Sequence, residues 1–168
     1  MLKQSFFDPD EEKLVERATQ IGDVYYFVTT LGEVVPMDLS GNIPAILPRW
    51  SLVSDEEREE GWAPGGWQLM AASPGLNRLY VLMHPDHKPL NWEDPSQIIW
   101  VFDLETGKKI GTLDSPGLIW SLSATSDDKP LLLGMNIEGG MEIFDLTKGE
   151  HTGTMEGLSA TPTLVINH

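Results

Sequence analysis

The residues best suited to chemistry lie in one short stretch, His84-Pro85-Asp86-His87. Two imidazoles and a carboxylate are ligand types that transition metals accept. The spacing, with its proline, matches no known metal motif, and no third histidine lies nearby in the sequence. The stretch therefore predicts a polar surface loop, with a metal site formed by His84, Asp86 and His87 as the alternative.

Other signatures of catalysis are weak or missing. Glu93 and Asp94 form a carboxylate pair, but the chain has 26 acidic residues, so such a pair is expected by composition alone. There is no cysteine, which excludes disulfides, thiolate nucleophiles and cysteine-ligated metals. No nucleophile elbow, phosphate loop or zinc signature is present. We therefore predict no catalytic and no cofactor-binding residue in this chain.

Charge narrows the possible partners. The net charge of −15 over 168 residues argues against binding to nucleic acid, whose phosphates require lysine and arginine, and against an anionic membrane surface. The N-terminus lacks the apolar core of a signal peptide, and no apolar run is long enough to cross a membrane. The expectation is a protein that stays where it is made, in a compartment that the sequence does not identify.

The elements that must position these residues are β-strands joined by turns. The stretch from Ile98 to Leu113 begins with β-branched and aromatic residues, continues through an Asp-Leu-Glu-Thr-Gly turn and resumes an extended pattern. It predicts a β-hairpin, in which Gly107 supplies a positive φ. Sixteen glycines and 12 prolines fit a turn-rich β protein.

The same alternation predicts most other elements. Ser54 with Glu57 three residues later is a capping box that begins a short acidic helix in an inserted loop. Asp114 to Gly117 is expected to turn the chain, and 85–96 to form a long polar loop. The first 20 residues fit either a helix that begins near Asp8 or a short irregular strand. Further strands are expected at 23–30, 33–39, 43–48, 67–72, 78–84, 118–124, 130–135 and 141–146.

An internal repeat organises these strands. Residues 99–113 align with 141–155 at a period of 42, and a third copy lies at 34–42, so that Asp38, Asp103 and Asp145 are equivalent. We interpret these aspartates as turn residues, because one occurs in every unit. A period near 40 with four strands per unit is typical of a β-propeller blade. The predicted fold is an all-β partial propeller of about three four-stranded antiparallel blades, at 14–50, 62–114 and 117–156.

Three blades are too few to close a ring, since closed propellers have about four to eight. An open stack would leave sheet faces and a spare strand at 161–167 exposed. We therefore expect a homodimer that closes a six-bladed ring, with Thr163, Leu164, Val165 and Ile166 of each copy adding to the other.

Several phrases carry a family resemblance: SFFDPDEEKL, VVPMDLSG, WSLVSDEEREEGWAPGGWQLMA, NRLYVLMHPDHK and IWVFDLETGKKI. Together they resemble the C-terminal part of the heavy subunit of the quinoprotein amine dehydrogenases, which act on methylamine and on aromatic amines. The resemblance implies a seven-bladed periplasmic propeller. It also implies a disulfide-rich light subunit that carries tryptophan tryptophylquinone, oxidises the amine and passes electrons to a carrier such as a copper protein.

The departures from that family limit what the resemblance implies. The N-terminal blades, the signal peptide and the cysteine-rich light chain are not in this sequence. We interpret the six tryptophans as propeller packing and expect no amine dehydrogenase activity from the chain alone. The resemblance does suggest a partner-docking surface on the face with the two insertions. Its candidate residues are Trp62, Pro64, Gly65, Gly66, Trp67, His84 and Trp92.

Two functions from different classes remain at this point. One is a non-catalytic scaffold that closes its ring by homodimerisation. The other is a blade-supplying subunit of a split amine dehydrogenase, which would close with a light subunit or a second propeller fragment. A ligand-binding or hydrolytic activity in the central channel of the assembled ring is neither supported nor excluded by the sequence.

Overall fold

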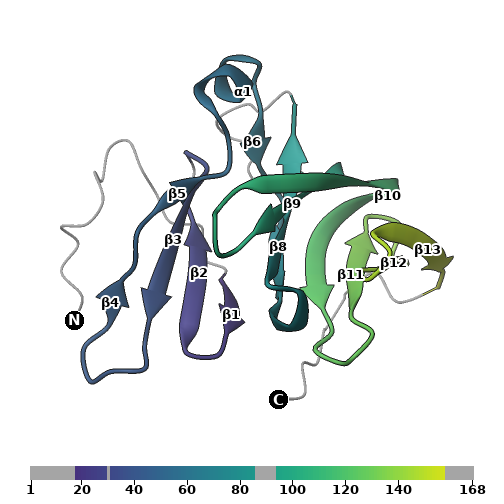
Figure 1. Cartoon of the computed structure of the whole chain (residues 1–168). Coiled ribbons are helices and arrows are strands. Elements are labelled where there is room, and N and C mark those ends of the chain that lie inside the picture. The colour runs from purple at the N-terminus through teal and green to yellow at the C-terminus, as the bar shows by residue number, and fades with distance from the viewer. Residues whose placement is uncertain (1–17, 30, 86–93, 158–168) are drawn as a thin grey trace.

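Strands make up almost all of the computed structural model, which describes residues 18–29, 31–85 and 94–157. These residues form a five-stranded and an eight-stranded sheet, in which the named strands pair antiparallel (Figure 1). The helices among them are a single turn of α-helix and a 3-10 turn, Pro74–Leu76. None of the helices in this part of the chain could cross a membrane.

The first sheet follows chain order, from β1 to β4, and β5 pairs with β3 beside β4. Its register places Tyr26 opposite Pro36 and Tyr25 opposite Met37. For the first 20 residues the sequence was compatible with either a helix or a strand, and the structure has a strand, β1, beginning at Thr19. The predicted helix start near Asp8 lies outside the described residues. The strands are β1 (Thr19–Ile21), β2 (Val24–Val28), β3 (Glu33–Asp38), β4 (Ala45–Ile46) and β5 (Trp50–Ser51).

The second sheet contains the hairpin predicted at 98–113, which is confirmed as β9 and the first half of β10. The order is β13-β12-β11-β10-β9-β8-β6, and β7 also pairs with β8. Its strands are β6 (Ala63–Pro64), β7 (Met70–Ser73), β8 (Arg78–His84), β9 (Ser96–Asp103), β10 (Lys109–Ala124), β11 (Leu131–Asn136), β12 (Met141–Asp145) and β13 (Glu150–Met155).

The turn predicted at Asp114 to Gly117 is wrong. β10 runs through these residues as one bent strand (Figure 1). Its first half pairs with β9, its second half pairs with β11, and the register with β9 shifts between Asp114 and Ile119. Proline is accepted here because the strand is changing neighbours, so a missing N–H interrupts no continuous ladder.

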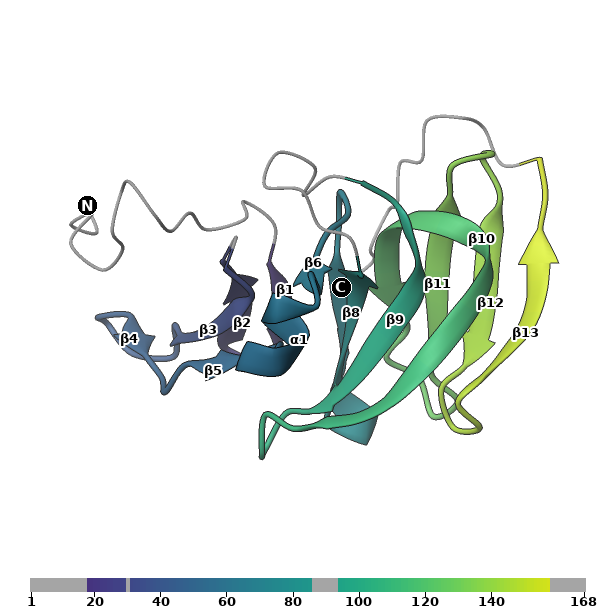
Figure 2. The same cartoon turned by 90° about the horizontal axis from the view of Figure 1, so that it is seen from above.

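The arrangement is a partial β-propeller. Strands β1, β7 and the second half of β10 are the inner strands of three successive blades. Thr19 Oγ1 in β1 accepts from the amide of Ala72 in β7 at 3.0 Å. Leu122 in β10 donates to the carbonyl of Gln68, two residues before β7, at 2.8 Å, so the inner edges of successive blades contact each other. Figure 2 shows β3 and β4 at one end of the molecule and β12 and β13 at the other. The blade limits 14–50, 62–114 and 117–156 remain our proposed division.

The repeated aspartates are confirmed as turn residues. Asp38 Oδ1 accepts from the amide of Ser40, Asp103 Oδ1 from the amide of Thr106, and Asp145 Oδ1 from the amide of Thr147, at 2.8–2.9 Å. These are Asx turns, in which the side chain substitutes for a backbone acceptor. The hydroxyl and amide of Thr106 hold the pKa of Asp103 below its ordinary value.

The core joins the two sheets through aromatic side chains. Trp50 of the first sheet lies 5.5 Å from Phe102, and Trp62 lies 4.8 Å from Trp100, measured between ring centroids. Tilted contacts at these distances are favourable for aromatic pairs. Trp50 therefore packs between the two sheets, whereas Trp62 and Trp100 pack on each other within the second blade.

Helix α1 (Asp55–Glu59) confirms the predicted capping box. Ser54 Oγ accepts from the amide of Glu57, and the Glu57 carboxylate accepts from the amide of Ser54. The helix buries no residue, so it is held by the cap, by the Arg58–Asp55 ion pair at its surface and by an ion pair to β10. In the pair to β10, Lys109 Nζ lies 2.7 Å from Glu57 and 3.4 Å from the centroid of the Trp100 ring.

Two glycines at equivalent turns of the repeat give a matched test of the hairpin. Gly107 and Gly149 both have positive φ, at +67° and +70°. A Cβ on Gly107 would lie 3.0 Å from the Trp50 ring, whereas a Cβ on Gly149 would meet nothing within 4 Å. We expect Gly149→Ala to lower the free energy of unfolding by about 1 kcal/mol, the cost of a left-handed alanine. Gly107→Ala should cost clearly more, because Trp50 must also move. Urea unfolding of both variants measures the difference, and equal losses would contradict it.

Candidate functional site

The predicted metal ligands are only partly described. His84 ends β8, and its Nε2 atom is buried without a hydrogen-bond partner. Asp86 and His87 lie outside the described residues, as do Trp92 and the ring-closing residues Thr163, Leu164, Val165 and Ile166. In the part of the chain that the structure describes, no three histidine or acidic side chains are grouped to hold a metal ion.

The predicted docking residues divide into two environments. Pro64, Gly65 and Gly66 are buried, and Trp62 packs against the core on Trp100. Trp67 is the exception, with 47% of its surface exposed. Gly66 adopts φ +136°, and a Cβ there would lie 2.8 Å from Leu82, so the turn requires glycine. Docking at this turn remains a prediction.

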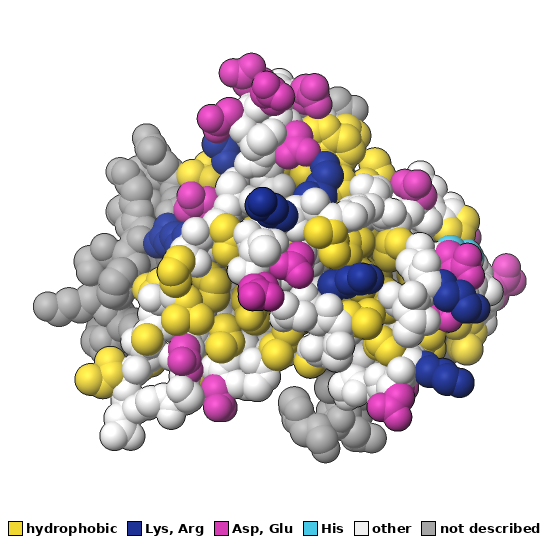
Figure 3. All heavy atoms as spheres, in the orientation of Figure 1, with side chains coloured by type: hydrophobic (Ala, Val, Ile, Leu, Met, Phe, Trp, Pro, Cys, Tyr) yellow, Lys and Arg dark blue, Asp and Glu magenta, His cyan; other side chains and the backbone are white. Residues whose placement is uncertain are grey.

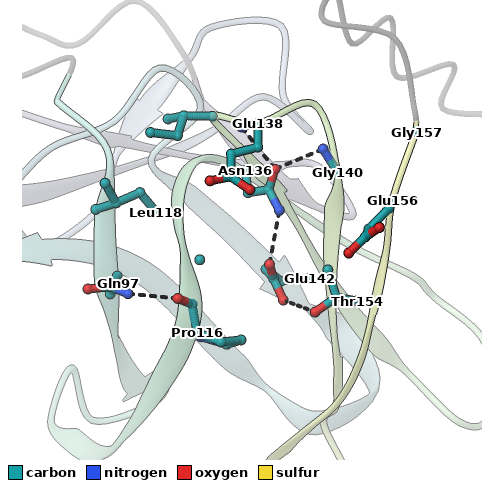
Figure 4. A pocket seen from close by; sticks show the side chains of 12 residues that line it. Gln97, Pro116, Leu118, Asn136, Glu138, Gly140, Glu142, Thr154, Glu156 and Gly157 are labelled. Atoms are coloured by element: carbon teal, nitrogen blue, oxygen red, sulfur yellow. Dashed lines mark hydrogen bonds between the residues drawn. The ribbon is translucent and has the colours of Figure 1, made fainter.

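A pocket that the sequence did not predict lies at one end of the eight-stranded sheet. It has a volume of about 670 Å³ and lies between the bend of β10 and the ends of β11, β12 and β13 (Figure 4). The residues that line it include three glutamates and no lysine or arginine. They are Gln97, Pro116, Gly117, Leu118, Asn136, Ile137, Glu138, Gly140, Glu142, Thr154, Glu156 and Gly157.

Glu142 is the most constrained side chain of the pocket. Only 3% of its side chain is exposed, yet it has three hydrogen-bond partners. Oε1 accepts from Asn136 Nδ2 at 2.9 Å, and Oε2 accepts from Thr154 Oγ1 at 2.7 Å. His151 Nε2 lies 2.8 Å from the same Oε2 atom. The carboxylate thus links β11, β12 and β13 through side chains.

The protonation of Glu142 follows from these contacts. Burial raises the pKa of this carboxyl, but the hydrogen bonds from Thr154, Asn136 and His151 outweigh burial and lower it overall. The carboxylate is therefore ionised at neutral pH. Because its oxygens already accept from three donors, the arrangement acts as a structural link and holds no free catalytic base.

Glycine at two positions makes this arrangement possible. A Cβ on Gly117 would lie 2.6 Å from Glu142 Oε1, and a Cβ on Gly140 would lie 2.9 Å from Asn136 Nδ2. Gly117 was predicted to form a turn. Its observed role is to let β10 pass close to the carboxylate.

Glu142 and His151 occupy repeat positions that hold different residue types in the preceding blade, so the repeat did not indicate a buried carboxylate. At the 42-residue period, Glu142 is equivalent to Trp100 and His151 to Lys109. In one blade Lys109 lies over the Trp100 ring, and in the next His151 contacts the Glu142 carboxylate. The same two strand positions therefore hold a cation–π pair or a carboxylate–imidazole pair. A glutamate in an alternating strand gives no local signal of its burial.

The molecular surface has two further features. Acidic side chains gather around α1 (Figure 3), in its first turn Asp55, Glu56 and Glu57. Hydrophobic side chains are spread over the β1–β4 sheet in the same view (Figure 3). Several large apolar residues are strongly exposed, among them Ile43 at 82% and Ile110 at 51%.

The strand order and the contacts between inner strands define a protein of the β-propeller class. Solved structures agree on the fold. The WD40 repeats of RRP9 superpose with a TM-score of 0.55 at 9% identity, over 89% of this chain and 42% of that chain. Hydrazine synthase of Kuenenia stuttgartiensis superposes with a TM-score of 0.54 at 14% identity, over 82% of this chain and 34% of that chain.

Sequence comparison then gives the family. The family model of the methylamine dehydrogenase heavy chain matches residues 1–168, so the chain belongs to that family. The methylamine dehydrogenase heavy chain of Methylorubrum extorquens is 31% identical over 139 residues, covering 82% of this chain and 34% of the relative. The heavy chain of Methylophilus methylotrophus is 28% identical over 137 residues, covering 80% and 33%. The chain thus spans about a third of the length of these relatives.

Proposed function

We propose that this heavy-chain propeller segment is a non-catalytic scaffold that completes its ring with a second copy of itself. The observation that carries the proposal is a pair of apolar sheet faces at the two ends of the blade series, which do not contribute to the main core. On the first blade the face consists of Tyr25, Phe27, Val35, Met37 and Ile46. On the last blade it consists of Leu131, Leu133, Met135, Met141 and Ile143.

The burial pattern of the last blade supports this choice, although Val35 and Met135 within the two faces are buried. Along β12, Glu142 and Phe144 are buried, whereas Met141 and Ile143 are only half-buried. Met155 on the adjacent edge strand is 48% exposed. Apolar patches of this kind on a sheet mark a surface that packs against another protein surface. In a propeller, such a sheet face packs against the next blade.

The test is the mass of the purified chain in solution. Light scattering coupled to size exclusion should give twice the chain mass of 18.7 kDa, because two copies supply six blades. The mass should stay constant upon dilution through the micromolar range. A monomer of constant mass, or a polydisperse aggregate, would contradict the proposal.

Family membership favours a second candidate function. The relatives are named as heavy chains of methylamine dehydrogenase, so this chain could supply blades to a split amine dehydrogenase. In that case a light subunit would carry the tryptophan tryptophylquinone cofactor, and this chain would carry none. Adding methylamine and a redox dye to the dimer should then give no turnover unless a quinone-bearing light subunit is present. A complex with that subunit, with turnover, would favour this second function over the scaffold.

A further inference from the structure

The two sides of each blade can be told apart by the repeat. Met37, Phe102 and Phe144 are equivalent, as each directly precedes the turn aspartate. Pro36, Val101 and Ile143 are the residues before them and point to the other side of their strands. We call the side with Met37, Phe102 or Phe144 the leading face, and the side with Pro36, Val101 or Ile143 the trailing face.

Within the chain the leading face of a blade contacts the blade before it. Phe102 on the second blade lies 5.5 Å from Trp50 of the first, measured between ring centroids. Phe144 on the third blade is fully buried in the main core cluster. Tyr26 of the first blade, which lies opposite Pro36 on the trailing face, also packs against that cluster. Val101 and Ile99, on the trailing face of the second blade, belong to the same core cluster as Phe144, so both internal contacts join a trailing face to a leading face.

Among the described blades, the faces that pack on no other blade are one of each kind. The first blade presents its leading face, with Met37 opposite Tyr25 and Ile46. The third blade presents its trailing face, with Ile143 opposite Leu133. Neither Met37 nor Ile143 belongs to the core cluster. The chain therefore has one free leading face and one free trailing face. These are the two kinds of face that pack on each other between its own blades.

We propose that the trailing face around Ile143 of one copy packs on the leading face around Met37 of a second copy, and that the reciprocal contact closes the ring. This inference rests on the proposed function, since it names the contact by which the dimer forms. Two identical trailing-to-leading contacts are related by a two-fold axis, so the assembly closes at two copies and leaves no further face for growth. Glu33 lies on the same side of β3 as Met37, and Asp145 lies on the same side of β12 as Ile143, so the apolar contact is confined to the centres of the two faces.

Charge substitutions test the pairing directly. Ile143→Lys should prevent dimer formation, and Met37→Glu should do the same, because each buries an unpaired charge at both contacts. Mixing the two variants in equal amounts should restore a dimer. One of its contacts then joins the introduced lysine to the introduced glutamate, and the other has the original residues. Ile110→Lys, at an exposed position outside both faces, is the control and should stay dimeric.

Cross-linking gives a second test that does not depend on a disruptive charge. The chain has no cysteine, so Met37→Cys with Ile143→Cys introduces the only two thiols. A short bismaleimide should link this double variant into a covalent dimer, and the pair Met37→Cys with Ile110→Cys should remain unlinked.

The outcomes separate the two levels of the proposal. A wild-type chain that is monomeric contradicts the scaffold dimer itself. A wild-type dimer that persists in both charge variants, or that fails to cross-link through positions 37 and 143, leaves the dimer standing and overturns this pairing. A mixture that stays monomeric while both variants show the wild-type circular dichroism spectrum also overturns it.

Discussion

Replacing Glu142 with leucine is expected to lower the free energy of unfolding by about 3–5 kcal/mol, the range for removing one partner of a buried charged group. The substitution leaves the Asn136 amide, the Thr154 hydroxyl and the His151 imidazole without their shared acceptor, in a site where only 3% of the carboxylate side chain is exposed. Urea unfolding at pH 7 measures the loss. Glu150→Leu on the adjacent strand, where the side chain is 60% exposed, should change stability by less than about 0.5 kcal/mol.

The pH dependence of the same group provides an independent check. The pKa of Glu142 is lowered in the folded protein from its ordinary value of 4.5. The unfolded chain therefore binds a proton more readily, so the stabilisation is complete above about pH 5 and is lost as the pH falls through the folded pKa. Wild type should lose more stability between about pH 5 and about pH 3 than Glu142→Gln does. Parallel pH profiles for the two proteins would contradict the ionised, hydrogen-bonded carboxylate.

Phe144→Ala is the second large effect that we expect, with a loss of about 3–5 kcal/mol. The side chain is fully buried and lies edge-on to His151, with ring centroids 5.2 Å apart. Removing it opens a cavity in the core and takes away one wall of the Glu142 site. Urea or thermal unfolding checks the value. Ile110→Ala, at a half-exposed position on β10, is the control and should stay within about 0.5 kcal/mol of wild type. A loss below about 1 kcal/mol for Phe144→Ala would mean that the third blade is not packed on the core.

The sequence was sufficient for the strand hairpins and for local turn chemistry. The hairpin around Gly107 and the capping box at Ser54 depend on residues within a few positions of each other, and both were predicted correctly. The repeat of Asp103 and Asp145 was enough to indicate blades, because each aspartate forms its turn with its own neighbours. These features can be predicted because their physical causes are local in the chain.

The features that were missed depend on distant residues. Asp114 to Gly117 has the composition of a turn, but β10 stays extended because it pairs with β9 on one side of the bend and β11 on the other. Glu142 resembles a solvated acid in an alternating strand, and its burial requires donors from the two neighbouring strands β11 and β13, together with glycine at position 117. No short-range pattern contains that information.

The double pairing of β10 also has a consequence for how such a protein changes in length over evolution. The strand closes one blade and opens the next, so no peptide boundary separates the two structural units. Within residues 99–155, where the repeat has a period of 42, a tandem duplication of 42 residues therefore adds one whole blade whichever residue it starts from, because every starting phase contains the same complement of strand segments. Gain or loss of blades by duplication and deletion then needs no precise crossover point, and propellers of different blade number can descend from one ancestral gene.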